Sequence, residues 1–270
     1  MLRHRIAGLL AAVLLVGAGS VPAIGGTKPR QPVRSFAPAK EVNYREPARA
    51  YVVTNAFGWT VQLEDELATN QSVLCRKAVG RLERKLAALA GSLPASSHAR
   101  LRRLPIFLML GEEAADGGRD NGAEYFQRHA PDHYPLMDPR WGSSLVIYSA
   151  RNYLQLSEEW ALRLLIHEFA HAWQLEQWPE DQPDILGAFQ QAMDKGLYRD
   201  VRDVNGDPVA KAYAAQNQLE YFAELSCTYF LRGEYEPFDR VELRRYDPKG
   251  LSMIEKMWGL HSSPPAASRP

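Results

Sequence analysis

The chain of 270 residues contains little cysteine, and it has no excess of charge of either sign. Its two cysteines, Cys75 and Cys227, exclude a fold built on several disulfides. One bridge between them and two buried free thiols both stay open, because the sequence does not define the geometry that a disulfide needs. Lysine plus arginine and aspartate plus glutamate each number 32, so the formal net charge is zero. We therefore expect no nucleic-acid partner, since no basic surface would attract one.

A hydrophobic segment long enough to span a membrane, about twenty residues, is also missing. The apolar run at residues 6–16 is shorter; Arg3 and Arg5 precede it, and small residues follow it as far as Ala23. A basic start, an apolar run and then small residues are typical of a secretory signal peptide. We predict a cleaved signal peptide at residues 1–23, a secreted or periplasmic location, and no membrane span in the mature chain. An uncleaved anchor is the alternative.

The rest of the chain predicts a single domain without internal repeats. Residues 24–48 are rich in proline, arginine and lysine and follow neither a helical nor a strand period, so we predict a flexible lead-in. Residues 261–270 consist mostly of small residues and predict a disordered tail. Between them, residues 49–260 are enough for one sizeable hydrophobic core. We expect this domain to be a monomer.

The most informative feature is a His-Glu-x-x-His motif formed by His167, Glu168 and His171. It lies in an apolar helical segment that begins after Ser157, a good N-cap, and stops before Pro179. Two histidines four residues apart project from the same face of a helix, where they can bind one zinc ion. Glu168 is then placed beside the metal, where a carboxylate can take a proton from zinc-activated water. We therefore predict Zn²⁺ as the cofactor, with His167 and His171 as two of its ligands.

A catalytic zinc site needs a third protein ligand and an open position for water. The best source is residues 213–225, because four polar side chains share one face if this segment is helical: Tyr213, Asn217, Glu220 and Glu224. Two acids one turn apart among aromatic residues are explained if one binds zinc and the other bonds a ligand histidine. Spacing alone allows either Glu220 or Glu224 to be the metal ligand.

Together the two segments resemble the anthrax lethal factor-like zincin metallopeptidases and their secreted bacterial relatives. The matching residues are His167, Glu168, Phe169 and His171 in the first segment and Tyr213, Glu220, Phe222 and Glu224 in the second. The resemblance implies three metal ligands: His167, His171 and Glu220. It also implies that Glu168 is the general base, that Tyr213 hydrogen-bonds the tetrahedral oxyanion, and that Glu224 is a hydrogen-bond partner of a ligand histidine.

The remaining segments predict an α+β fold. Strands are predicted at residues 50–54, 59–63, 105–110 and 145–148, and helices at residues 66–89, 184–197 and 250–258. Residues 116–122 and 203–207 resemble calcium loops in composition only, and we predict turns there. A small mixed sheet packed on helices, followed by a helical C-terminal half, is the layout of a zincin-like metalloprotease domain. In that layout an extended substrate would add a strand along the sheet edge.

The function predicted from these features is a secreted zinc metallopeptidase, a hydrolase that cleaves a peptide or protein substrate with zinc-activated water and Glu168 as general base. One alternative is a zinc-stabilised binding protein of the cell envelope that cleaves nothing. Glu168 and Tyr213 argue against it, because a structural zinc site needs neither a base nor an open position. The other alternative is a zinc amidase that acts on a non-protein amide. Such enzymes take cysteine as the third ligand, and Cys227 is poorly placed for this relative to Glu220 and Glu224.

Overall fold

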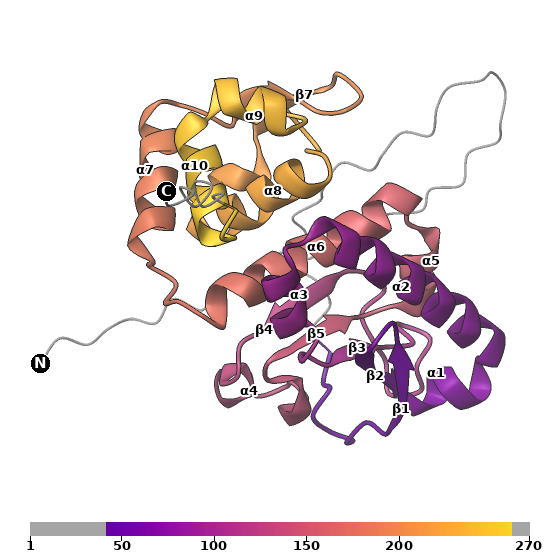
Figure 1. Ribbon diagram of the computed structural model, residues 1–270. Helices are drawn as coiled ribbons and strands as arrows, with labels where there is room; N and C mark the ends of the chain where they lie inside the picture. The colour runs from indigo at the N-terminus through magenta and orange to yellow at the C-terminus, as the bar shows by residue number, and fades with distance from the viewer. Residues whose placement is uncertain (1–41, 261–270) are drawn as a thin grey trace, which may run out of the picture.

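The computed structural model describes residues 42–260 of the chain. The predicted signal peptide, residues 24–41 of the predicted lead-in and the predicted tail lie outside this range. Within it, a five-stranded sheet and its helices form one half of the molecule, and a mostly helical half follows in sequence (Figure 1). Helix α6 (Glu158–Leu175), which carries the His-Glu-x-x-His motif, lies between the two halves (Figure 1).

Five strands make up the main sheet: β1 (Tyr51–Ala56), β2 (Trp59–Glu64), β3 (Ile106–Leu108), β4 (Ala123–Phe126) and β5 (Ser144–Ile147). Their order is β1-β2-β3-β5-β4, so β1 and β4 are the edge strands. The outer pairs β1–β2 and β4–β5 are antiparallel, whereas β3 runs parallel to both of its neighbours. The predictions of an α+β fold and of a small mixed sheet are therefore confirmed.

The first hairpin forms where the sequence predicts it. Phe57 and Gly58 connect β1 to β2 with φ angles of 48° and 85°, the left-handed values that a type I′ hairpin turn requires. Asn55 stabilises this turn, because its side-chain oxygen accepts the Gly58 N–H at 2.9 Å. Trp59 and Val61, at alternate positions of β2, are fully buried. One face of the hairpin is thereby anchored in the core.

Helices surround the sheet and dominate the second half (Figure 1). The predicted helix at residues 66–89 is present but is broken at Gln71 into α1 and α2, and the predicted helices at residues 184–197 and 250–258 correspond to α7 and α10. The helices other than α6 span α1 (Asp65–Asn70), α2 (Ser72–Ser92), α3 (Ala95–Leu101), α4 (Ala130–His133), α5 (Ala150–Gln155), α7 (Pro183–Asp194), α8 (Gln218–Phe230), α9 (Arg240–Tyr246) and α10 (Pro248–Met257).

Three strands were not predicted from the sequence. β6 (Arg199–Arg202) and β7 (Pro208–Lys211) form an antiparallel hairpin in the second half, with the predicted turn at residues 203–207 between them. The third is β4, an edge strand of the main sheet. It has only four residues and includes Glu124, so it lacks the long apolar alternation by which strands are recognised in a sequence.

Hydrophobic side chains pack against both faces of the sheet and form a larger and a smaller core. The smaller core contradicts one prediction. This core is built around Trp141, whose ring centroid lies 4.6 Å from that of Tyr44 and 5.8 Å from that of Phe126. Tyr44 is 4% exposed, and its N–H donates to the carbonyl oxygen of Leu136 at 2.7 Å. The prediction that a flexible lead-in extends to residue 48 is therefore wrong, because Tyr44 is needed to complete this core.

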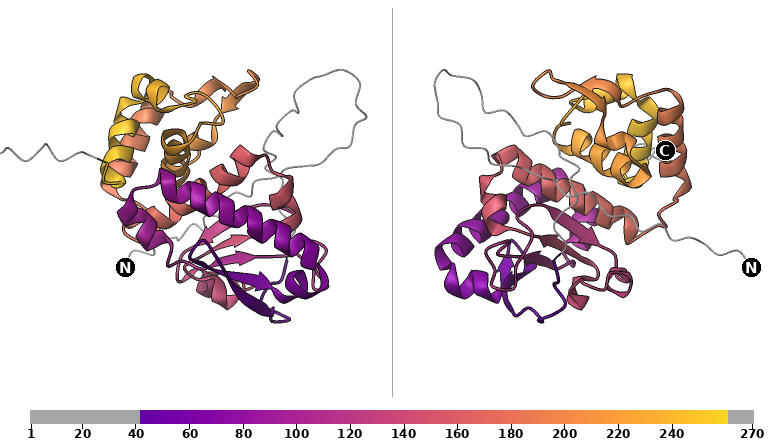
Figure 2. Two further views of the ribbon diagram at one scale, coloured as in Figure 1. Left: turned by 45° about the vertical axis from the view of Figure 1, so that its right-hand side comes forward. Right: turned by 180° about the vertical axis from the view of Figure 1, so that it is seen from behind.

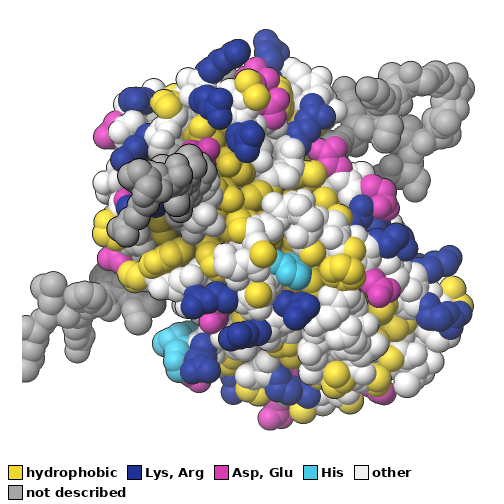
Figure 3. Space-filling model, in the orientation of Figure 1, with side chains coloured by type: hydrophobic (Ala, Val, Ile, Leu, Met, Phe, Trp, Pro, Cys, Tyr) yellow, Lys and Arg dark blue, Asp and Glu magenta, His cyan; other side chains and the backbone are white. Residues whose placement is uncertain are grey.

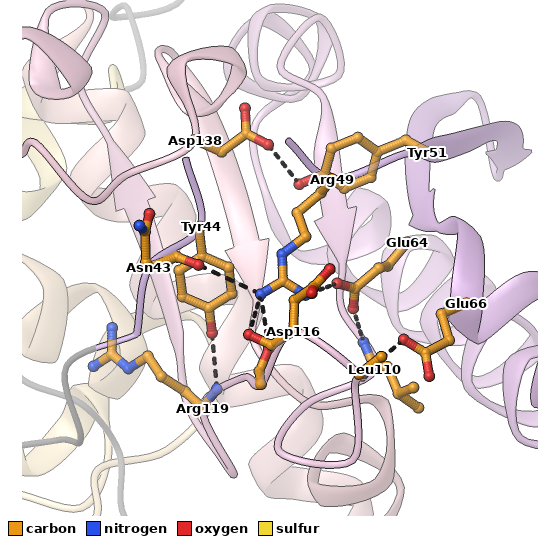
Figure 4. Close-up of polar contacts among 12 residues, drawn as sticks. Asn43, Tyr44, Arg49, Tyr51, Glu64, Glu66, Leu110, Asp116, Arg119 and Asp138 are labelled. Atoms are coloured by element: carbon orange, nitrogen blue, oxygen red, sulfur yellow. Dashed lines mark hydrogen bonds and ion pairs between the residues drawn. The ribbon is translucent and has the colours of Figure 1, made fainter. Parts of the chain in front are cut away.

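A buried polar network holds the loop that precedes β4 (Figure 4). We call it the Arg49 cluster and define it as Arg49, Glu64 and the main-chain groups of Leu110, Asp116 and Gly117. Arg49 Nη1 lies 3.0 Å from Glu64 Oε1, and Arg49 Nη2 donates to the carbonyl oxygens of Asp116 and Gly117 at 2.9 and 2.8 Å. Glu64 Oε2 accepts the Leu110 N–H at 2.7 Å. Both buried charges are thus paired within the chain.

The start of α6 is fixed by a cap and by one arginine. Ser157 Oγ accepts the Trp160 N–H at 3.1 Å, as expected of an N-cap. Arg81, a buried residue of α2, donates to four carbonyl oxygens just before the helix, those of Tyr153, Leu154, Leu156 and Ser157. These bonds tie α6 to the first half. In both views of Figure 2 the second half, coloured orange to yellow, lies above the sheet-bearing half.

Charge is mixed on the surface that Figure 3 presents. Lysine and arginine side chains are spread over both halves on this face, with aspartate and glutamate among them. This distribution agrees with a formal net charge of zero. Among residues 42–260, no helix has the length and apolar character that crossing a membrane would require.

Candidate metal centre

Helix α6 presents two histidines one turn apart on the same face. His167 and His171 are 5% and 6% exposed, and their Nε2 atoms lie 3.1 Å apart. The helix around them is apolar; Leu165 and Phe169, for example, are fully buried in the larger core. Because the helix is anchored in this way, both imidazoles direct one nitrogen toward the same point.

Helix α8 brings two glutamates to this point, but it begins later than the sequence predicts. Asn217 is its N-cap, and Oδ1 of Asn217 accepts two N–H groups of the first turn, each at 2.9 Å. Tyr213 precedes it in a separate 3₁₀ turn, η2 (Tyr213–Ala215). The prediction of one helix over residues 213–225 is therefore wrong, because a capping asparagine favours a helix start at its own position. Glu220 and Glu224 keep their one-turn spacing within α8.

His167, His171 and Glu220 form what we call the His–Glu cluster. Glu220 Oε2 is buried and lies 3.2 Å from His167 Nε2 and 3.5 Å from His171 Nε2. With the 3.1 Å between the two nitrogens, the three atoms form a nearly regular triangle. Ligand atoms of a tetrahedral zinc site with bonds of about 2.0–2.1 Å lie about 3.3 Å apart, so the cluster fits three ligands of one zinc ion. In the described part of the chain, no other set of three His, Cys, Asp or Glu side chains converges in this way.

Glu224 lies behind His167 and outside the His–Glu cluster. Its Oε1 is 3.0 Å from Nδ1 of His167, the ring nitrogen on the side away from the cluster. Its Oε2 accepts hydrogen bonds from Arg163 Nη2 at 2.6 Å and from the Tyr235 hydroxyl at 2.7 Å. A carboxylate bonded to one ring nitrogen fixes the tautomer and leaves the other nitrogen to a metal. These positions favour Glu220, rather than Glu224, as the candidate ligand.

Burial and neighbouring charges act against each other in this region. Burial disfavours the charged form of Glu220, but attraction to His171 and His167 outweighs it and lowers the pKa of Glu220. Burial likewise disfavours a charge on His167, yet its contacts with Cys227, Glu220 and Glu224 raise its pKa. The buried carboxylates therefore attract positive charge to this point, which protons or a metal ion can supply.

Glu168 lies beside the cluster and faces the edge of the sheet. It is 4% exposed, and its Oε2 accepts the N–H of Tyr125, a residue of β4, at 2.9 Å. Tyr125 is paired with Leu145 of β5, whose own N–H donates toward β3. The Tyr125 N–H therefore points to the free edge of the sheet. Burial raises the pKa of Glu168, although the two histidines of the cluster oppose this rise.

Tyr213 lies against His167 from turn η2. The two ring centroids are 6.0 Å apart with 30° between the ring planes, and Tyr213 is 6% exposed. The fold thus brings together the six residues singled out in the sequence: His167, Glu168, His171, Tyr213, Glu220 and Glu224. Tyr213 approaches from a turn and not, as expected, from a helix face that it shares with Glu220.

The contacts of three further residues in this region were not predicted from the sequence. Arg163 is one helical turn before His167, which was a usable signal, but its partner Glu224 lies 61 residues away. Tyr235 follows α8, and its spacing does not predict a bond to Glu224. Tyr125 contributes a main-chain N–H, which any residue type could supply. These contacts depend on how α6, α8 and β4 pack together.

Cys75 and Cys227 are both buried and free, so they form no disulfide with each other. Cys227 is fully buried in α8, and its Sγ donates to the carbonyl oxygen of Arg163 at 3.7 Å. It is not one of the three converging donors. A zinc site with a cysteine ligand therefore gains no support.

No protein-family model, curated protein or solved structure matches this chain. Its function has to be inferred from the chemistry of the site, since a fold alone does not define an activity.

Proposed function

We propose that this protein is a zinc-dependent metallopeptidase that hydrolyses peptide bonds. The observation that carries the proposal is the His–Glu cluster, in which three protein donor atoms lie 3.1–3.5 Å apart with Glu168 buried beside them. Structural zinc sites are closed by four protein ligands, whereas catalytic sites use three and keep one position open. Three donors and an adjacent carboxylate thus support a catalytic site with Zn²⁺ as cofactor.

The metal ligands in this proposal are His167, His171 and Glu220. Zinc held by them would supply Lewis-acid chemistry that activates water and polarises a carbonyl group. Glu224 would orient the His167 ring, because its Oε1 lies 3.0 Å from His167 Nδ1. Arg163 in turn holds Glu224 by the 2.6 Å bond to Oε2.

Glu168 would act as general acid and base. Its Oε2 is occupied by the Tyr125 N–H, so Oε1 is the atom that would accept a proton from the attacking water as the new C–O bond forms. The same oxygen would return that proton to the amine nitrogen as the C–N bond breaks. The bond to β4 holds the carboxylate in one orientation during both transfers.

Tyr213 would stabilise the oxygen that gains negative charge when the carbonyl is attacked. A hydroxyl fixed before the reaction begins can donate a hydrogen bond to this oxyanion. The buried position of Tyr213 against the His167 ring supports this role.

An extended peptide bound along β4 would explain why Glu168 lies at the sheet edge. β4 is an edge strand, and Ala123 and Tyr125 occupy the register positions whose main-chain groups face away from β5. Glu168 accepts the Tyr125 N–H, so a peptide would pair with the other main-chain groups of this edge. A peptide that pairs with this edge by main-chain bonds would bring its backbone next to Glu168. This arrangement supports a peptide or protein substrate. The predicted signal peptide would direct the enzyme out of the cytoplasm, so the substrate would be met there.

Neither alternative function gains a supporting observation. A binding protein that uses zinc only for stability has no need of a buried carboxylate held beside three ligands. An amidase with a cysteine ligand is disfavoured because Cys227 lies outside the His–Glu cluster.

The decisive variant is Glu168→Gln, which removes the base and keeps the shape of the side chain. We expect kcat/KM for a cleaved peptide to fall about 10²- to 10⁴-fold, while zinc remains near one ion per chain by elemental analysis. The matched control is Glu64→Gln, because Glu64 is equally buried (both 4% exposed) and lies in the Arg49 cluster. Full activity in Glu168→Gln would refute the proposed mechanism.

The reaction itself is tested by incubating a peptide library with the zinc-loaded protein, with and without a chelator. Cleavage of internal peptide bonds that the chelator abolishes supports a metallopeptidase. Retained zinc without any cleavage would instead favour the binding protein.

A further inference from the structure

Tyr235 connects two parts of the site that are separate in sequence. It lies after α8, is 6% exposed, and uses its hydroxyl twice. The hydroxyl donates to Glu224 Oε2 at 2.7 Å, and it accepts the N–H of Ala214 at 2.7 Å. Ala214 follows Tyr213 directly in turn η2. One hydroxyl therefore contacts both the carboxylate behind His167 and the turn that carries Tyr213.

The backbone around Tyr235 is held by the segment that leads into this turn. The Val204 N–H donates to the carbonyl oxygen of Glu234 at 3.0 Å, and the Glu236 N–H donates to that of Arg202 at 2.9 Å. Tyr235 itself forms a β-bridge with Asp203. Because bonds lie on both sides of Tyr235, its side chain enters the core from a fixed position.

The bonds of Glu224 show what the hydroxyl contributes. Oε2 of Glu224 accepts from both Arg163 and Tyr235, which leaves Oε1 opposite His167 Nδ1 at 3.0 Å. Two donors on one oxygen restrict rotation of the carboxylate more than one donor does. Loss of the tyrosine hydroxyl would remove one of these two donors and hold the carboxylate less firmly in this orientation.

The bond to Ala214 has an equivalent effect on η2. Ala214 is fully buried, so its N–H cannot turn to water when the hydroxyl is removed. A buried N–H without a partner is costly, and the turn would shift to satisfy it. Such a shift moves Tyr213, the neighbouring residue.

We propose that Tyr235 is a positioning residue that couples the orientation of the metal ligand His167, through Glu224, to the placement of Tyr213, through the η2 turn. The proposal rests on the proposed function for the role of Tyr213, but its effect on zinc affinity can be measured without any substrate.

The test is Tyr235→Phe, with Tyr198→Phe as a matched control. The Tyr198 hydroxyl donates to Oδ2 of Asp247 at 3.0 Å, and this oxygen is shared with Tyr221, just as Glu224 Oε2 is shared with Arg163. Tyr198 is also buried. In each variant, a buried carboxylate oxygen that accepts two hydrogen bonds thus loses one of its two donors. Their thermal midpoints are compared first, so that a general loss of stability is separated from an effect on the site.

Zinc dissociation constants are then measured by competition with a chromogenic chelator. We expect Tyr235→Phe to weaken zinc about 3- to 10-fold, less than the 10- to 100-fold typical of a group that bonds a ligand directly, and Tyr198→Phe to leave it unchanged. In Glu224→Gln, adding Tyr235→Phe should weaken zinc by less than it does in the wild-type protein, because the hydroxyl acts through Glu224. Wild-type affinity in Tyr235→Phe, an equal loss in Tyr198→Phe, or strictly additive losses in the double variant would each overturn the proposal.

The coupling to Tyr213 is tested by kinetics at saturating zinc. Tyr235→Phe should lower kcat several-fold with KM little changed, and it should have a smaller effect on kcat in a Tyr213→Phe background. If the wild-type protein cleaves no peptide, the proposed function fails, yet the zinc measurements still decide the coupling through Glu224. An unchanged kcat together with weakened zinc would overturn the part that concerns Tyr213.

Discussion

The Arg49 cluster and the His–Glu cluster both contain buried charged side chains, but they differ in the partners of these charges. In the Arg49 cluster, Arg49 and Glu64 pair with each other, and their remaining hydrogen bonds are to main-chain groups of the same chain. In the His–Glu cluster, two imidazole nitrogens and Oε2 of Glu220 point at one another from 3.1 to 3.5 Å. Three potential acceptors that converge in this way need a shared positive partner.

This difference separates a structural network from a binding site. Buried polar groups are normally satisfied within the protein, because an unsatisfied one costs about 1–3 kcal/mol. In the Arg49 cluster, both Nη atoms of Arg49 and both carboxylate oxygens of Glu64 have partners within the chain, and these bonds tie the loop before β4 to the sheet. In the His–Glu cluster, protons on the histidines or a metal ion can supply the positive partner, so under the proposed function its stability should depend on zinc. Variants of the His–Glu cluster should therefore lose zinc, whereas variants of the Arg49 cluster should lose folding stability.

The largest effect is expected for Glu220→Gln, which replaces the carboxylate of the His–Glu cluster by a neutral amide. We expect zinc to be lost outright, and with it the rise in thermal midpoint that zinc should cause in the wild-type protein. Zinc content by elemental analysis and melting curves with and without zinc measure both effects. Glu64→Gln, the corresponding change in the Arg49 cluster, should keep zinc near one ion per chain. A Glu220→Gln protein with full zinc content would exclude Glu220 as a ligand.

Arg49→Met should produce the opposite pattern, namely a less stable protein with unchanged zinc affinity. The change removes one partner of a buried ion pair, which typically costs about 3–5 kcal/mol because the other charge is left unpaired. Urea denaturation of the zinc-free protein measures the free energy of unfolding, and chelator competition measures zinc binding. If zinc affinity fell as steeply as stability, the two clusters would not be independent.

The sequence predicted the parts of the His–Glu cluster that lie within single helices. Ser157 as N-cap and the apolar residues around His167 and His171 define α6 locally, so the motif and its helix could be predicted together. The spacing of Glu220 and Glu224 likewise depends only on α8. The predicted start of that helix is wrong because Asn217 could either belong to a polar helix face or cap the helix. In the structure it is the N-cap.

Features that depend on packing between elements were not predictable in the same way. The strand β4 is short and carries Glu124, and it is stabilised as a strand by pairing with β5. Tyr235 gains its importance from Glu224 and Ala214, and no local pattern links these three residues. The Arg49 cluster joins residues up to 68 positions apart. Each of these depends on tertiary contacts that a single sequence does not reveal.

Glu224→Gln should have a smaller effect than Glu220→Gln, because Glu224 bonds His167 and lies outside the His–Glu cluster. We expect zinc to bind about 10- to 100-fold more weakly, the usual result when the partner of a ligand histidine is altered. Dissociation constants for the two variants, measured by the same competition method, give the ranking. The reverse order, with zinc lost in Glu224→Gln and only weakened in Glu220→Gln, would make Glu224 the ligand.

The smallest effect is expected for Glu124 of β4, which shares one property with each of the two clusters. Its Oε2 accepts hydrogen bonds from the Tyr148 hydroxyl at 2.9 Å and from Arg119 at 3.3 Å, so it has partners within the chain, as Glu64 does. Burial nevertheless raises the pKa of Glu124 to about 7, although Arg119 and Tyr148 oppose the rise. The folded state thus holds the proton more tightly than the unfolded state, in which the pKa is near 4.3.

The stability that this proton gives is complete below about pH 4.3 and is lost as the pH rises to about 7. Glu124→Gln keeps an acceptor for Tyr148 and cannot ionise, so it should escape this loss. The variant should match the wild-type protein near pH 4 and exceed its free energy of unfolding by roughly 1–2 kcal/mol at pH 8. Urea denaturation across this range measures the difference, with Glu46→Gln at an exposed position as control. A difference that stays constant with pH would mean that the pKa of Glu124 is not raised in the folded state, and would contradict this prediction.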